Sequence, residues 1–284
     1  MHRILTAELD LDLGGSVDLI LQISAAHPAP IVHEELMIRD GDRVYTPTEI
    51  VDQTGSRLHR VSCDAGGLSI RYRAIVDGAV APRMTSDLEA ITYLRPSRYC
   101  QADEVFAQAR RQFGGLQGLD LITAVGDFVA SSTTYTPGLS HGTDSAVTTL
   151  MTGQGVCRDY AHVVIALLRA MDVPARYAAC YAPGLRPMDF HAVAEAYVDG
   201  QWYVIDATRL AHRASLVRIA TGRDAADCAF VSYYGGELAL RHLAVDAVLS
   251  PASTPTTIPT ASAPTPAPTT PLAPDDPAAL VQLA

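Results

Sequence analysis

The first 84 residues alternate between short apolar stretches and turn-forming residues, a pattern typical of β-strands. The clearest stretch, Leu68–Val76, places apolar and polar side chains in turn and ends in an Asp77-Gly78 turn dipeptide. Similar stretches cover residues 17–23, 31–38, 43–47 and 57–63. We therefore predict a small, β-sandwich-like N-terminal domain over residues 1–84.

Residues 85–250 follow a different pattern. Apolar residues recur at helical spacing in 101–113, in 119–131 and most clearly in Cys157–Met171. Strand-like segments follow at 175–181, 192–198 and 202–205, and Asp199-Gly200 between the last two predicts a β-hairpin. Helices followed by antiparallel strands indicate the α+β class, with one core domain over residues 85–250.

The last segment, residues 251–284, contains 9 of the 18 prolines together with many threonines and alanines. Such a composition buries too little apolar surface to offset the entropy that is lost on ordering. We predict that this Pro/Thr/Ala-rich tail is disordered.

Charge and hydropathy exclude several classes of protein. The chain has 284 residues, a net charge of −10 and a pI of about 5.3, and all 21 basic residues are arginines. An acidic chain without a basic cluster is not expected to bind nucleic acid or a membrane surface. No apolar run approaches the ~18 residues of a membrane-spanning helix, and the acidic residues 1–13 lack the apolar centre of a signal peptide. We therefore expect a cytoplasmic protein.

The five cysteines are Cys63, Cys100, Cys157, Cys180 and Cys228. Their wide spacing contains no C-x-x-C pair, so the sequence predicts neither a zinc ribbon nor a redox motif. An odd number of cysteines without a secretion signal is typical of free thiols in a reducing compartment. An EF-hand loop or an acidic cluster at calcium-ligand spacing is also absent from the sequence. We expect no metal and no cofactor.

One of these thiols, Cys157, is placed for chemistry. It follows Gly153 and Gly155 and begins the strongest helical pattern of the chain. Unpaired backbone N–H groups and the helix dipole favour a thiolate at such a position, and the thiolate is the nucleophilic form of cysteine. The alternative is a small buried cysteine that starts a core helix, and this segment alone does not decide between the two.

Two further residues, His191 and Asp206, complete a candidate constellation. His191 begins one strand of the predicted hairpin and Asp206 follows the other, 15 residues later. A hairpin can therefore place the imidazole and the carboxylate side by side. The carboxylate would fix the histidine tautomer, and such a histidine can hold a thiolate and protonate a leaving amine. The order Cys157, His191, Asp206 points to thiol-dependent catalysis more strongly than any of the three residues alone.

These residues lie in three motifs, which are G-V-C-R-D-Y-A-H at 155–162, D-F-H-A at 189–192 and W-Y-V-I-D-A-T at 202–208. In this order the motifs resemble those of the transglutaminase-like superfamily, specifically bacterial transglutaminase-like cysteine proteases. The resemblance covers most of residues 85–240. It implies a papain-like α+β core with Cys157 as nucleophile, His191 as general base and acid, and Asp206 as orienting acid. One departure is Val193, where many members have tryptophan.

The resemblance implies a hydrolase that cleaves an amide or peptide bond of a protein or peptide substrate through a thioester. Transfer of the acyl group to an amine, as in a transglutaminase, and a non-catalytic binding module remain the alternatives. The oxyanion of the tetrahedral intermediate needs hydrogen-bond donors. The backbone N–H of Cys157 is the first, and Gln154 or Tyr99 is a candidate for the second. We expect Asp159 to cap the helix start, and His162 to be structural because it lies about 140° around the helix from Cys157.

Overall fold

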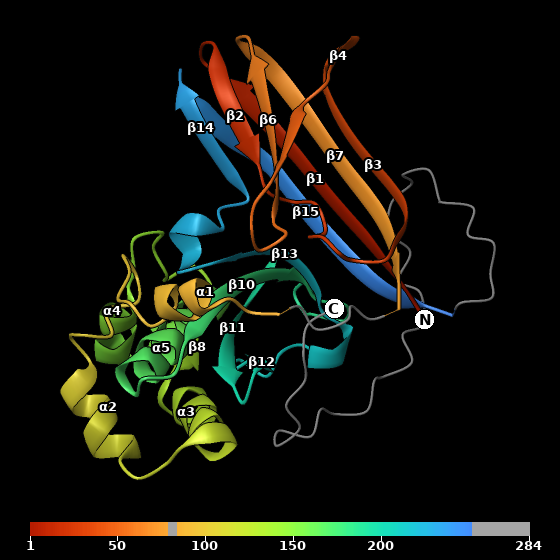
Figure 1. Ribbon diagram of the computed structural model, residues 1–284. Coiled ribbons are helices and arrows are strands. Elements are labelled where there is room, and N and C mark those ends of the chain that lie inside the picture. The colour runs from red at the N-terminus through yellow and green to blue at the C-terminus, as the bar shows by residue number, and fades with distance from the viewer. Residues whose placement is uncertain (79–83, 252–284) are drawn as a thin grey trace.

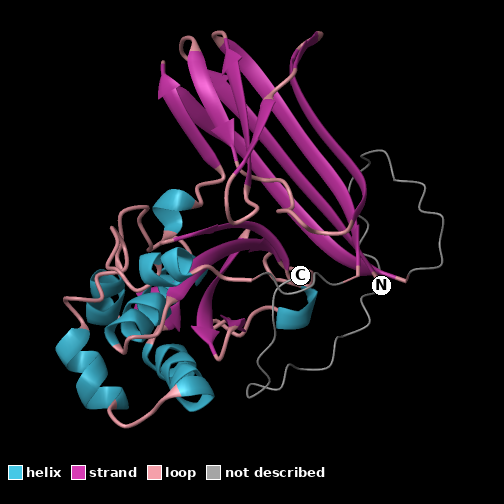
Figure 2. Ribbon diagram, viewed as in Figure 1, coloured by secondary structure: helices cyan, strands magenta, loops and turns pink. Residues whose placement is uncertain are grey.

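The computed structural model describes residues 1–78 and 84–251, which form a β-sandwich and a helical domain (Figure 1). Figure 2 shows long strands gathered in the sandwich, and helices gathered on the other domain around a smaller sheet. The α+β class and the β-sandwich at the N-terminus are thus confirmed. The tail predicted to be disordered, residues 251–284, lies outside the described residues except for Pro251.

Two antiparallel sheets form the sandwich. The first has the strand order β15-β1-β7-β3-β4 and the second has the order β14-β2-β6-β5. The strands are β1 (His2–Leu13), β2 (Val17–Leu21), β3 (Ile31–Asp40), β4 (Arg43–Tyr45), β5 (Thr48–Val51), β6 (Arg57–Cys63), β7 (Gly66–Asp77), β14 (Val231–Gly235) and β15 (Leu238–Ser250).

Alternating burial explains why the sandwich segments form strands. In β1 every second side chain from Arg3 onward is buried, and β7 shows the same alternation from Leu68 onward. Successive side chains of a strand point to opposite faces of the sheet, so one face of each strand supplies the core. Leu5, Leu9 and Ile70 on these inward rows are fully buried.

The last two strands depart from the domain boundary that the sequence predicts. β15 pairs with β1 from Leu238 opposite Leu13 to Ser250 opposite His2, and β14 pairs with β2. Residues 231–250, expected in the core domain at 85–250, therefore belong to the sheets of the sandwich. The physical reason is that β1 needs a second hydrogen-bonding neighbour, because an unpaired strand edge leaves its N–H and C=O groups open. The helical domain is thus inserted between β7 and β14.

The helical domain contains a sheet with the strand order β12-β11-β10-β13 and a short parallel pair, β8-β9. Its helices are α1 (Asp87–Thr92), α2 (Phe106–Phe113), α3 (Gly118–Ser132), α4 (Ala146–Thr152) and α5 (Cys157–Ala170). Its strands are β8 (Thr134–Tyr135), β9 (Gln154–Gly155), β10 (Ala175–Tyr181), β11 (His191–Val198), β12 (Gln201–Ile205) and β13 (Val217–Gly222). Single 3₁₀ turns lie at Arg213–Ser215 and Ala225–Asp227.

Helix α5 is the centre of this domain. All of its side chains from Asp159 to Ala170 are buried, which is typical of a helix enclosed on every side. Helix α3 approaches strand β12 closely at Gly126, where an added Cβ would lie 3.1 Å from Cγ2 of Ile205. Helix α5 therefore lies in a densely packed domain, in which α3 and β12 also contact closely.

The hairpin of β11 and β12 forms as the sequence predicts. Val198 pairs with Gln201, and the two residues between them, Asp199 and Gly200, have φ angles of 49° and 81°. Positive φ at both positions is the signature of the tight turn that matches the twist of a two-residue hairpin.

Hydrogen bonds fix the sandwich to one side of the smaller sheet. The hydroxyl of Tyr181 in β10 donates to the carbonyl of Ile23 at 2.7 Å. The N–H of Ala26 donates to the carbonyl of Arg218 in β13 at 2.8 Å. The loop that follows β2 thus supports β10 and β13 from outside the helical domain.

Candidate active site

Cys157 opens helix α5 and is the one cysteine among the described residues that is not buried. The chain reaches it through Gly153, which ends α4 in the left-handed conformation with φ 65°. Val156 at the N-cap has no side-chain oxygen, so its side chain does not compete for the N–H groups of the first turn. The thiol therefore lies at the positive end of a buried helix and remains within reach of solvent.

The hairpin brings His191 and Asp206 together. Nε2 of His191 lies 2.9 Å from Oδ2 of Asp206, and the two residues are 2% and 8% exposed. The other carboxylate oxygen, Oδ1, accepts the backbone N–H of Thr208 at 3.0 Å and its hydroxyl at 2.6 Å. Because both of its oxygens are bonded, the carboxylate holds the imidazole in one orientation.

The remaining imidazole nitrogen, Nδ1, is buried and makes no hydrogen bond of good geometry to any residue that the structure describes. The thiol of Cys157 lies against this imidazole. Burial lowers the pKa of His191, but Asp206 and Cys157 outweigh burial and raise this pKa to about 10. Burial raises the pKa of Asp206, whereas His191 and the bonds from Thr208 lower it below its usual value. The arrangement therefore favours an imidazolium between a carboxylate and the thiol.

Comparison with known proteins identifies the family and the fold. The sequence profile of the transglutaminase-like superfamily matches residues 107–207. The crystal structure of a candidate cysteine protease from Cytophaga hutchinsonii has a TM-score of 0.80 and 32% identity, over 87% of this chain and 90% of that one. The chain belongs to the transglutaminase-like superfamily. Its helical domain is the papain-like core that the sequence motifs imply.

Two other relatives match the transglutaminase-like chain less closely. An uncharacterised protein of Mycobacterium leprae is 26% identical over 145 residues, which are 48% of this chain and 52% of that protein. This chain thus spans about half the length of that curated relative. The periplasmic domain of TgpA from Pseudomonas aeruginosa is 19% identical, with a TM-score of 0.41 over 72% of this chain and 90% of that one.

Tyr135 is a residue of the transglutaminase-like core that sequence reasoning missed. Strand β8 pairs in parallel with β9, so that Tyr135 lies opposite Gly155 and close to Cys157. The phenol of Tyr135 lies near the backbone N–H of Cys157, which opposes the rise of the phenol pKa. Burial, together with the charges of Cys157, Asp189 and Asp206, raises the pKa of this phenol to about 12. Tyr135 therefore keeps its proton at neutral pH and can donate a hydrogen bond.

The structure gives the surroundings of the two sequence-based candidates for the second oxyanion donor. The ring of Tyr99 stacks on His162 with ring centroids 5.3 Å apart, and His162 is on another face of α5 than Cys157. Gln154 is exposed in β9. Tyr135 lies near the backbone N–H of Cys157.

His162 and Asp159 have the positions that the sequence predicts. His162 is fully buried, and its Nε2 accepts the N–H of Ala225 at 3.2 Å. Burial lowers the pKa of His162 to about 3, so this histidine is neutral. The carboxylate of Asp159 accepts the N–H of Val156 at 2.8 Å, which caps the start of α5.

The other four thiols are enclosed in the protein. Burial raises the pKa of Cys63 and raises the pKa of Cys100 to about 12. It also raises the pKa values of Cys180 and Cys228 well above the usual range. These four groups are therefore protonated and unreactive near neutral pH.

Within residues 1–78 and 84–251, no group of three or more His, Cys, Asp and Glu residues could hold a metal ion. None of the helices in the same ranges is long and apolar enough to cross a membrane.

Proposed function

We propose that this transglutaminase-like chain is a thiol hydrolase that cleaves an amide or peptide bond. Cys157 is the nucleophile, His191 the general base and acid, and Asp206 the residue that orients the imidazole. The observation that carries the proposal is the imidazole itself. Nε2 of His191 lies 2.9 Å from the carboxylate of Asp206, whose other oxygen accepts hydrogen bonds from Thr208. Nδ1 of His191 has no hydrogen-bond partner among the described residues, and the imidazole lies against the accessible thiol of Cys157.

In the first half of the reaction, the Cys157 thiolate attacks the amide carbon and the carbonyl becomes an oxyanion. The C–N bond then breaks, and the imidazolium of His191 gives its proton to the departing amine. In the second half, the neutral imidazole takes a proton from water as that water attacks the thioester. The second oxyanion collapses, the carboxylic acid leaves, and the thiolate and imidazolium are restored.

The oxyanion receives two hydrogen bonds in this proposal. The phenol of Tyr135 lies near the N–H of Cys157. When the substrate oxygen binds at this N–H, the hydroxyl of Tyr135 can donate to the same substrate oxygen. Donors preorganised in this way stabilise the transition state more than the substrate.

We propose that water, rather than an amine, is the acceptor. Trp202, the one tryptophan of the chain, lies under the guanidinium of Arg176 at 3.9 Å and packs edge-on against Tyr93. Val193 is 1% exposed and packs in a buried apolar cluster that includes Val204. Neither residue provides an aromatic wall that would shield a thioester from water.

Selective alkylation tests the nucleophile. Brief treatment with iodoacetamide near neutral pH, followed by peptide mapping, should label Cys157 before the four buried thiols. The unaltered chain should also hydrolyse p-nitrophenyl acetate, an activated acyl donor, and Cys157→Ala should not. Equal labelling of all thiols, or no labelling of Cys157, would contradict the proposal.

A second assay separates hydrolysis from acyl transfer. Incubation with a glutamine-bearing protein and a fluorescent primary amine should give no more label than the Cys157→Ala control. The chain contains no lysine, so its own side chains cannot compete with the fluorescent amine as acyl acceptors. Strong Cys157-dependent incorporation of the amine would make transamidation the activity instead.

A further inference from the structure

A buried carboxylate lies beside the nucleophile and has no part in the chemistry proposed above. Asp159 is the third residue of α5 and is 1% exposed. Its Oδ2 accepts the backbone N–H of Val156 at 2.8 Å and the hydroxyl of Ser140 at 2.5 Å. Its Oδ1 accepts from Nη2 of Arg158 at 3.1 Å. One side chain thus joins the residue before the nucleophile to the loop at 136–145.

Arg158 closes this cluster from the other side. Its Nη2 also donates to the hydroxyl of Ser140 and to the carbonyl of His141, both at 2.6 Å. The guanidinium therefore balances the charge of Asp159 and holds the loop against the start of α5.

The glycine of the G-V-C-R-D motif makes room for this carboxylate. A Cβ on Gly155 would lie 2.6 Å from Cβ of Asp159 and 2.8 Å from its Oδ2, distances that real Cβ atoms do not show. The φ angle of Gly155 is not positive. Glycine is required at position 155 because Asp159 occupies the space that a side chain would need. The backbone conformation itself would accept another residue.

Asp159 holds the backbone of Val156 from both sides. Its carboxylate binds the N–H of Val156, while its own N–H, together with that of Tyr160, donates to the carbonyl of Val156 at 2.9 and 3.1 Å. That carbonyl and the N–H of Cys157 belong to the same planar peptide unit. The bonds to Val156 therefore set the direction in which the N–H of Cys157 points.

We propose that Asp159 is a positioning residue, which fixes the peptide unit that presents the N–H of Cys157 to the oxyanion. This inference rests on the proposed function. Because the oxyanion exists only in the transition state and in the tetrahedral intermediate, loss of the positioning lowers kcat and leaves KM nearly unchanged. A residue that served stability alone would not produce this separation.

The test compares kcat and KM for p-nitrophenyl acetate in four variants. Asp159→Ala should lower kcat on the order of 10- to 100-fold, with KM within about twofold of the unaltered chain. Asp159→Asn should recover most of kcat, because its carbonyl oxygen can still accept the N–H of Val156. Gly155→Ala should reproduce the loss, because the added methyl group displaces the carboxylate.

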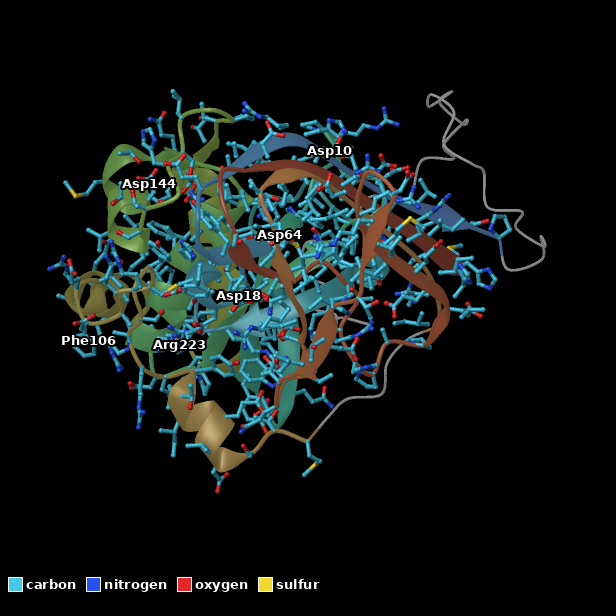
Figure 3. All side chains as sticks on the ribbon, turned by 90° about the horizontal axis from the view of Figure 1, so that it is seen from above. Asp10, Asp18, Asp64, Phe106, Asp144 and Arg223 are labelled. Atoms are coloured by element: carbon cyan, nitrogen blue, oxygen red, sulfur yellow. The ribbon has the colours of Figure 1, made fainter. Side chains whose placement is uncertain are left out.

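The matched control is Asp144→Ala. Asp144 belongs to the same loop, where it accepts the N–H of His141 at 2.7 Å, and it is partly exposed in the helical domain (Figure 3). Its removal should leave kcat and KM unchanged. A loss of kcat in this variant equal to that in Asp159→Ala would overturn the proposal, because the loop alone would then account for the effect.

Other outcomes also decide the matter. An unchanged kcat in Asp159→Ala, a change confined to KM, or an Asp159→Asn as slow as Asp159→Ala would each refute the positioning role. If Asp159→Ala does not fold, Gly155→Ala and Asp159→Asn carry the test, and failure of Gly155→Ala to fold would show a folding determinant instead. If the unaltered chain shows no Cys157-dependent hydrolysis, the proposed function falls and this inference falls with it.

Discussion

The substitution Asp206→Asn tests the candidate site most directly, because the structure dictates how the new amide would be oriented. Oδ1 of Asp206 accepts two hydrogen bonds from Thr208, at 3.0 and 2.6 Å. Only the carbonyl oxygen of an asparagine can accept them. The NH₂ group must then occupy the place of Oδ2, which lies 2.9 Å from Nε2 of His191.

An amide N–H that points at Nε2 forces this nitrogen to be the acceptor. The proton of the neutral imidazole then lies on Nδ1, so the base has no free lone pair on that nitrogen. The substitution also removes the carboxylate that raises the pKa of His191, and burial, which lowers the pKa, then dominates. Both effects remove the imidazolium, and the corresponding change in a serine protease triad costs ~10⁴-fold in kcat. We expect a loss of about 10³- to 10⁴-fold here.

The assay is steady-state hydrolysis of p-nitrophenyl acetate, with the folded fraction measured by circular dichroism. Asp224→Asn is the matched control. Asp224 is 2% exposed and accepts the N–H groups of Tyr99 and Ala226. Its substitution also places an amide among buried donors, but the imidazole near it is that of His162 and not that of His191. Its folded form should keep full activity. If Asp206→Asn folds and retains activity within about tenfold of the unaltered chain, the tautomer argument and the role of Asp206 are wrong.

Three further predictions concern the same structure. The stability contributed by the imidazolium of His191 is complete below pH ~6.5, the usual pKa of histidine, and is lost as the pH rises towards about 10. The Tm difference between the unaltered chain and Asp206→Asn, measured by calorimetry, should therefore shrink over that interval. A constant Tm difference would contradict the raised pKa of His191. Tyr135→Phe should lower kcat about 10²-fold with little change in KM, whereas equal turnover would exclude the phenol as a donor. A chain without residues 238–250 should lose cooperative thermal unfolding, because β1 loses one of its two neighbours; an unchanged Tm would show that the sandwich does not need β15.

The parts of the site that could be predicted from the sequence depend on local signals. Asp199-Gly200 specifies a two-residue turn, and that turn alone determines which residues of β11 and β12 lie side by side. His191 and Asp206 flank the paired segment, so their contact follows from the hairpin. The position of Cys157 follows equally from two glycines and a strongly apolar helix, both of which can be read within a few residues.

The parts that sequence reasoning missed depend on contacts between distant segments. Tyr135 reaches Cys157 through a parallel pair of two-residue strands, β8 and β9, and strands so short leave no alternation to detect. The pairing of β15 with β1 joins residues more than 200 positions apart. β1 alternates throughout, whereas β15 alternates only between Leu243 and Val248. Alternation also identifies a strand and not its neighbour. The domain boundary therefore could not be predicted from the pattern alone.

The insertion of the helical domain between β7 and β14 has a consequence for the order in which a ribosome delivers the parts of this protein. When β7 has been made, β1 and β2 each still lack the neighbour that β15 and β14 will supply. The whole helical domain must be synthesised before those strands emerge. The helical domain packs segments that are close in sequence, so it can fold first. The sandwich is complete only after β15 has been synthesised. The nascent chain therefore exposes open strand edges for most of its synthesis, and the supporting contacts from the sandwich to β10 and β13 arrive last.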